Sequence, residues 1–162
     1  MAVAALARRH GVRMWRRRCD AACGKGKVAG RAVWLFHPRT YMNRSGWAVA
    51  AAVDELGLEL SRLLVVSDDI SLPTGALRLR ARGSSGGHKG LQSIIEELDS
   101  QEFARLRVGV GDPGGEDAAD YVLAPFAPPE VPTINAALAR AADAVELWLA
   151  EGTARAMAAF NG

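Results

Sequence analysis

Residues 63–69, which read LLVVSDD, decide the fold class of this chain. Four apolar residues in a row predict a short strand that is covered on both faces of an α/β sheet. Two carboxylates follow at the C-terminal end of that strand, where open α/β sheets bind their ligands. The alternative for Asp68 and Asp69 is a turn before Pro73, and spacing alone does not decide between the two.

Helical and strand patterns alternate on both sides of this stretch. Residues 77–82 and 105–110 alternate apolar side chains with arginines, so each run predicts a strand with one buried face and one arginine face. The other expected elements are helices over 2–9, 45–56, 88–98 and 129–150 and a strand over 27–36, with Ser45 capping the second helix and Gly57 ending it. We therefore expect a single domain, 1–162, of the α/β class with a mixed sheet.

Composition and cysteine usage limit the possible classes of protein. Of the 162 residues, 49% are apolar and 23% are charged, which is typical of a globular domain. The two cysteines, Cys19 and Cys23, exclude a disulfide-rich secreted scaffold and fit the cytoplasm. They have no second pair and no His at ligand spacing, so we expect no metal. No apolar run approaches the ~18 residues of a membrane span, so we expect no membrane partner.

Charge is distributed unevenly along the chain. Residues 1–44 carry eleven Lys and Arg against one acid, whereas the remainder carries nine basic and seventeen acidic residues. A one-sided basic region is typical of proteins that bind polyanions. The alternative is a set of solvated arginines without a partner.

Gly-rich segments and His88 are the next candidates for a site. His88 follows the Gly/Ser run 83–87 and opens an expected helix, where free N–H groups and the helix dipole favour an anion; the alternative is a capping role. This run fails the P-loop pattern. Residues 109–114, GVGDPG, match G-x-G-x-x-G, but Pro113 in the turn makes a dinucleotide site a weak hypothesis. Asn43 either caps a helix or presents its amide to a substrate.

Four segments taken together resemble motifs of the bacterial peptidyl-tRNA hydrolase family. They are PRTYMNRSG at 38–46, SDDISLPTG at 67–75, RLRARGSSGGHKGL at 78–91 and FARLRVGVGDP at 103–113. Four motifs in the family's order and spacing form a specific signal. The resemblance runs from about residue 2 to residue 162.

The resemblance implies a monomeric α/β/α sandwich with a mixed, mostly parallel sheet. It implies hydrolysis of the ester between a peptide and the 3′ ribose of tRNA, in which a His acts as general base on water and needs no cofactor. Asp68 matches the carboxylate that orients this His, and Asn43 matches the residue that holds the substrate near the ester. The implied substrate- and tRNA-binding positions are Tyr41, Asn43, His88, Lys89, Arg80 and Arg107.

This sequence departs from the family pattern in two places. The family's first strand, its G-N-P-G loop and its T-R-H-N segment with the catalytic His have no match here, so we expect an N-terminally truncated domain that lacks the first strand. None of His10, His37 and His88 matches the catalytic position. We therefore expect the chain to bind tRNA-like polyanions better than it hydrolyses them.

The second departure is Lys89, which stands where the family usually has an Asn. A Lys adds charge suited to tRNA but loses the acceptor of an amide. The alternative function, from another class, is a non-catalytic RNA-binding relative that uses the fold as a scaffold.

Overall fold

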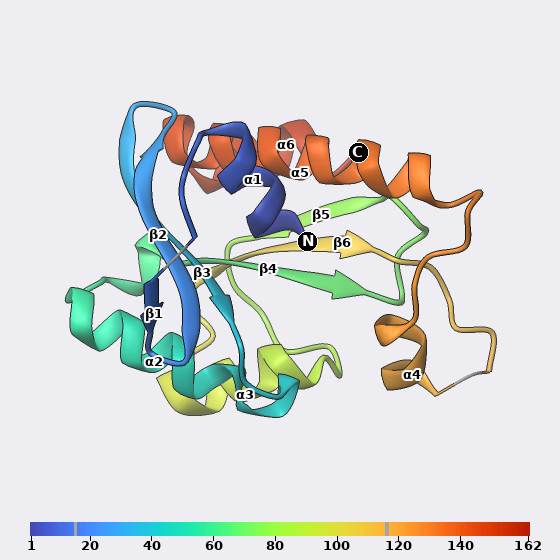
Figure 1. The fold of residues 1–162 in the computed structure, drawn as a ribbon, viewed down its shortest axis with the longest axis horizontal. Helices are drawn as coiled ribbons and strands as arrows, with labels where there is room; N and C mark the ends of the chain where they lie inside the picture. Colours follow the sequence, from blue (N-terminus) through green and yellow to red (C-terminus); the bar gives the residue numbers. More distant parts are fainter. Residues whose placement is uncertain (15, 116) are drawn as a thin grey trace.

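Two three-stranded sheets and the helices around them make up the computed structural model, which describes residues 1–14, 16–115 and 117–162 (Figure 1). The strand orders are β1-β2-β3 and β4-β6-β5. The strands are β1 Arg16–Arg18, β2 Ala21–Val28, β3 Arg31–Pro38, β4 Leu64–Asp69, β5 Leu77–Arg80 and β6 Ala104–Gly109. The helices are α1 Ala2–Arg9, α2 Ser45–Leu56, α3 Lys89–Leu98, α4 Ala118–Leu123, α5 Val131–Glu151 and α6 Thr153–Phe160, with the short 3-10 helices η1 Met42–Arg44 and η2 Leu60–Arg62.

The sheet β4-β6-β5 lies between two helical layers (Figure 1). Leu79 of β5 and Leu106 of β6 are fully buried against the alanine face of α5 and against α6. Leu91 and Ile94 of α3 belong to a second core cluster, which includes Val65 of β4. β4 runs parallel to β6 and β5 runs antiparallel to it. The expected α/β class with a mixed sheet is confirmed.

Strand direction differs in one respect from the mostly parallel sheet that the resemblance implies. Among the described residues, β4–β6 is parallel, whereas β1–β2, β2–β3 and β5–β6 are antiparallel. The expected single strand over 27–36 is wrong because these residues straddle the β2–β3 turn. Ala29 and Gly30 have φ values of 47° and 74°, as a two-residue type I′ turn requires. Alanine replaces the usual Asn or Asp of such a turn, so the sequence does not reveal it.

β4 is an edge strand, because within the described residues it pairs with β6 alone. The prediction that residues 63–66 are covered on both faces is therefore wrong, and residues 63–68 are half-buried. A groove of about 1980 Å³ runs beside β4 and is lined on the other side by residues of β3. Among the helices described, none is long and apolar enough to cross a membrane.

A close approach between α2 and α3 fixes the layer below the sheet. The N–H of Gly46 donates a hydrogen bond to Oγ of Ser93 at 2.9 Å, and both residues are buried. Gly57 ends α2 in the left-handed conformation, as expected. Ser45 does not cap α2; it is the first helical residue, and its hydroxyl contacts Sδ of Met42 at 3.9 Å.

Gly46→Ala is expected to destabilise the protein by about 1–3 kcal/mol. A Cβ at this position would overlap the carbonyl oxygen of Ser93, which is rigid helix backbone. Urea unfolding measures the effect. In an open helix the same substitution stabilises by about 0.5–1 kcal/mol, so a gain in stability would contradict the close approach.

Candidate active site

Asp68 and His88 meet beside the groove, although 20 residues separate them in sequence. Asp68 is placed by the C-terminal end of β4, and Nε2 of His88 lies 3.1 Å from its Oδ1. Their side chains are 30% and 17% exposed, so the pair is sheltered but reachable. The hydrogen bond from His88 lowers the pKa of Asp68, against the opposing effect of burial. The carboxylate is therefore ionised at neutral pH.

The second ring nitrogen of His88 caps α3. The N–H of Leu91 donates to Nδ1 of His88 at 3.1 Å, which satisfies one of the free amides at the start of the helix. Both contacts fit one neutral tautomer, in which Nε2 carries the proton and donates to Asp68 while Nδ1 keeps its lone pair. The capping alternative for His88 is thus confirmed, together with a contact to Asp68 that the sequence did not suggest.

Asp69 and Arg107 form a second ion pair next to the first. Asp69 is 5% exposed, and its Oδ1 accepts from the N–H and hydroxyl of Ser71. Its Oδ2 lies 2.8 Å from Nε of Arg107, a charge contact without good hydrogen-bond alignment. The other end of the Arg107 guanidinium lies against Gly86 in the loop before His88. Arg107 therefore joins the ends of β4 and β6 to that loop.

The alternation in 105–110 predicts that Arg105 lies on an exposed arginine face, and this prediction is wrong. It is 2% exposed, because β6 is the central strand of its sheet. Its guanidinium stacks 4.3 Å from the centroid of the Phe103 ring, and burial lowers its pKa. The backbone carbonyls that accept its hydrogen bonds are those of Gly83, Ser84, Gln101 and Phe103. Arg105 therefore holds the loop before His88 against the sheet.

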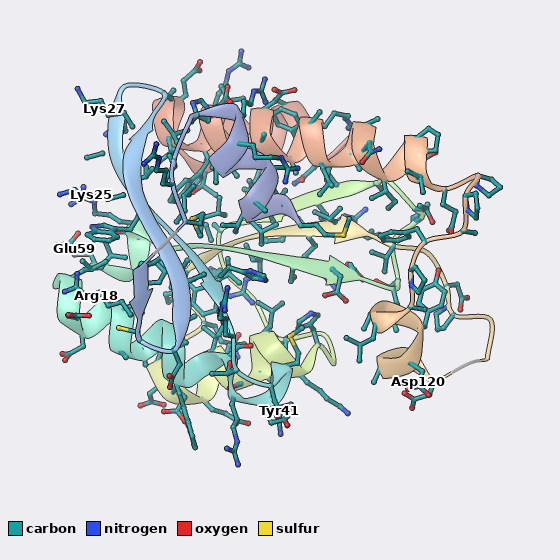
Figure 2. All side chains as sticks on the ribbon, viewed as in Figure 1. Arg18, Lys25, Lys27, Tyr41, Glu59 and Asp120 are labelled. Atoms are coloured by element: carbon teal, nitrogen blue, oxygen red, sulfur yellow. The ribbon has the colours of Figure 1, made fainter. Side chains whose placement is uncertain are left out.

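The remaining predicted binding residues surround the start of α3. Asn43 and Lys89 line one small depression of about 280 Å³, on elements η1 and α3 that contact each other. Tyr41 stands 81% exposed beside η1 (Figure 2). Arg80 is exposed on β5 opposite Arg105, and it has no ion-pair partner in the part of the chain that the structure describes. The structure thus gathers Asn43 with Lys89 and Asp68 with His88, and leaves Tyr41 and Arg80 free at the surface.

Sequence reasoning missed two hydroxyls on the groove. Thr40 Oγ1 and Ser67 Oγ line it, are buried, and have no hydrogen-bond partner among the described residues. Only their places beside Asn43 and Asp68 in the chain could have suggested them. Among the described residues, no group of three or more His, Cys, Asp or Glu is arranged to hold a metal ion.

Comparison with known proteins identifies the family. A family model described as peptidyl-tRNA hydrolase matches residues 1–162. The chain belongs to the peptidyl-tRNA hydrolase family. A peptidyl-tRNA hydrolase of Carboxydothermus hydrogenoformans is 46% identical over 161 residues, which cover 99% of this chain and 86% of that protein. One from Chloroflexus aggregans is 47% identical, over 98% of this chain and 86% of that protein.

Solved structures of peptidyl-tRNA hydrolases share the fold. The crystal structure of the enzyme from Acinetobacter baumannii superposes with a TM-score of 0.92 and 29% identity, over 99% of this chain and 83% of that one. The resemblance that the four sequence motifs carry is thereby confirmed for the peptidyl-tRNA hydrolase family.

Proposed function

We propose that this chain hydrolyses the ester between a peptide and the 3′ ribose of tRNA at the Asp68–His88 pair. Family membership makes the chain a carboxylic ester hydrolase that acts on peptidyl-tRNA, and identity of 46% to named hydrolases does not favour a non-catalytic scaffold. The observation that carries the assignment of residues is the 3.1 Å contact between an ionised carboxylate and an imidazole beside a groove.

His88 is the proton acceptor in this proposal. Asp68 accepts a hydrogen bond from the N–H at Nε2, so the proton stays on Nε2 and the lone pair is on Nδ1. Nδ1 is the nitrogen that takes a proton from water. The Leu91 amide occupies Nδ1 in the structure, and one neutral hydrogen bond contributes only about 0.5–1.5 kcal/mol. A water molecule therefore competes for Nδ1 at modest cost.

The reaction then proceeds in two balanced steps. Water adds its oxygen to the ester carbonyl and gives one proton to Nδ1 of His88, and the carbonyl oxygen becomes an oxyanion. The bond to the ribose oxygen then breaks, and the imidazolium returns its proton to that oxygen. The products are a peptide carboxylic acid, which loses its remaining proton to solvent at neutral pH, and tRNA with a free 3′ hydroxyl. The negative charge of Asp68 stabilises the imidazolium between the steps.

Substrate binding is assigned to the residues around the start of α3. Because His88 and Lys89 are consecutive, the groove and the Asn43–Lys89 depression adjoin each other at this helix start. In this proposal the Asn43 amide binds near the ester, Lys89 adds positive charge for tRNA, and Tyr41 contacts the substrate. Arg80 and Arg107 bind tRNA phosphate. We further propose a cytoplasmic monomer that uses no cofactor.

Two substitutions of His88 separate its three roles. His88→Asn keeps a side-chain acceptor that caps α3, because Asn is a strong N-cap, and His88→Gln places an amide donor near Asp68. Both remove the imidazole, so both are expected to lower kcat about 10²–10⁴-fold while tRNA binding stays within about twofold. The measurement is release of labelled peptide from peptidyl-tRNA. Unchanged turnover in either folded variant would rule out His88 as the base.

A further inference from the structure

Three exposed cations on the β2–β3 hairpin stand without an acidic partner. They are Lys25, Lys27 and Arg31, and we call them the hairpin cations. Within residues 1–14, 16–115 and 117–162, no carboxylate lies at ion-pair distance from any of them, whereas Arg9 is paired with Asp143 and Glu146 and Arg18 with Glu55. Figure 2 places Lys25 and Lys27 at the outer left margin of the molecule. Their charge is therefore available to a ligand.

An aromatic side chain backs this surface. Lys25 and Trp34 face each other across the hairpin, and the Lys25 ammonium lies 5.7 Å from the indole centroid. The Arg18 guanidinium lies 5.6 Å from the same ring, and Phe36 follows at 6.1 Å between ring centroids. Cations within ~6 Å of an indole are attracted to its face. Trp34 thus restrains the Lys25 side chain, so less conformational entropy is lost when Lys25 binds a ligand.

The nearest acids leave this surface positive. Glu55 is paired with Arg18, whereas Glu59, which Figure 2 shows between Lys25 and Arg18, accepts only the neutral hydroxyl of Ser61 at 3.5 Å and keeps its charge. Three hairpin cations against this one carboxylate still leave the surface positive. Asp20 lies at the opposite end of β2 from the hairpin turn. The combination of unpaired cations and half-buried aromatic rings is typical of a surface that binds nucleic acid.

The hairpin extends away from the proposed active site. β3 leads from Arg31 to Pro38, directly before the segment that carries Tyr41 and Asn43. At ~3.3 Å per residue, seven steps along this strand span ~23 Å. A ligand bound at both places must therefore be an extended polyanion, since a single terminal nucleotide does not reach from one to the other.

We propose that the hairpin cations bind the phosphate backbone of the tRNA substrate, at positions from ~13 Å (Lys25) to ~23 Å (Arg31) along β3 from Pro38. This proposal rests on the proposed function, because it takes the same substrate. A tRNA carries closely spaced phosphates along its stem, which match three cations spread over the strands next to the turn. The hairpin would then select a whole tRNA over shorter esters.

The test compares a hairpin variant with a control of equal charge. The hairpin variant carries Lys25→Gln, Lys27→Gln and Arg31→Gln, and the control carries Arg8→Gln, Arg140→Gln and Arg155→Gln, all at exposed positions. Binding of whole deacylated tRNA and of its 3′-terminal trinucleotide is measured by fluorescence anisotropy across a salt series. Thermal unfolding of both variants confirms that they fold.

The hairpin variant is expected to bind whole tRNA about tenfold more weakly than the control, with a salt slope lower by about 2 to 3. Trinucleotide binding should stay equal in the two variants. Equal affinity for whole tRNA would overturn the proposal, as would hairpin-dependent binding to vesicles containing phosphatidylserine without an effect on tRNA. Failure of the unaltered chain to bind either RNA would instead overturn the proposed function.

Discussion

Asp68→Asn is expected to lower kcat for peptidyl-tRNA about 10²–10⁴-fold and to leave KM within about twofold. Oδ1 of the carboxylate lies 3.1 Å from Nε2 of His88, accepts a hydrogen bond from it, and stabilises the charge that the imidazole acquires. An amide has the same shape but no charge. It can also turn its NH₂ toward Nε2, which selects the tautomer with the proton on Nδ1, and that tautomer cannot accept a proton from water.

Asp54→Asn is the matched control for this effect. Asp54 is exposed on α2 and the substitution changes the net charge by the same amount. Single-turnover hydrolysis gives the chemical step, and filter binding to the same peptidyl-tRNA gives affinity. A variant at Asp68 that lost affinity but kept the rate of the chemical step would assign this carboxylate to tRNA binding and not to proton transfer.

Arg105→Met is expected to lower the free energy of unfolding by about 2–5 kcal/mol. Methionine retains the volume and the contact with Phe103 but removes donors from four backbone carbonyls, two of them in the loop before His88. A buried acceptor left without a donor costs about 1–3 kcal/mol, and partial exposure of the loop to water recovers some of this. Urea unfolding measures the loss.

Loop behaviour distinguishes a specific effect from general instability. In Arg105→Met, amide hydrogen exchange should rise first in residues 83–87, because their carbonyl anchors are gone. Arg82→Met is the control, since Arg82 is 72% exposed and its ion pair with Glu102 is 3.6 Å long. The control should change stability by less than about 0.5 kcal/mol. A loss in Arg105→Met as small as the control's would refute the anchoring role.

The position of Asp68 was easier to predict from the sequence than the position of its partner, His88. The apolar run in 63–66 and the acids after it are local signals, so a carboxylate at a strand end was foreseeable. His88 is 20 residues away in another element, and its capping of α3 brings its ring to the β4 edge. No local pattern encodes that meeting, because it depends on how α3 packs against the sheet.

Arg105 shows where periodicity misleads. Alternation predicts that Arg105 and Arg107 share a face, which they do, but it does not say whether that face meets water. The face is covered by the loop over 83–87, which these two side chains hold. Arg80, on the edge strand β5, is exposed as the same pattern predicts. Strand order, which alternation does not reveal, makes the difference.

The hairpin shows a similar limit. A basic N-terminal region was evident from composition, but the turn at Ala29 and Gly30 was not, since alanine rarely adopts positive φ. The turn makes Lys25 and Trp34 partners across two strands. Charge along the sequence therefore predicted a polyanion ligand, and only the fold locates the surface that we propose for it.

Single-turnover hydrolysis of peptidyl-tRNA by the unaltered chain shows whether the Asp68–His88 pair cleaves the ester or the chain only binds its substrate. The enzyme is placed in excess over a substrate labelled on the peptide, so that all of the substrate is bound, and the released peptide is followed against a blank without protein. We expect release of the free peptide and of intact tRNA at a rate well above the blank. Substrate that is bound but stays esterified at the blank rate would show that the Asp68–His88 pair does not catalyse hydrolysis.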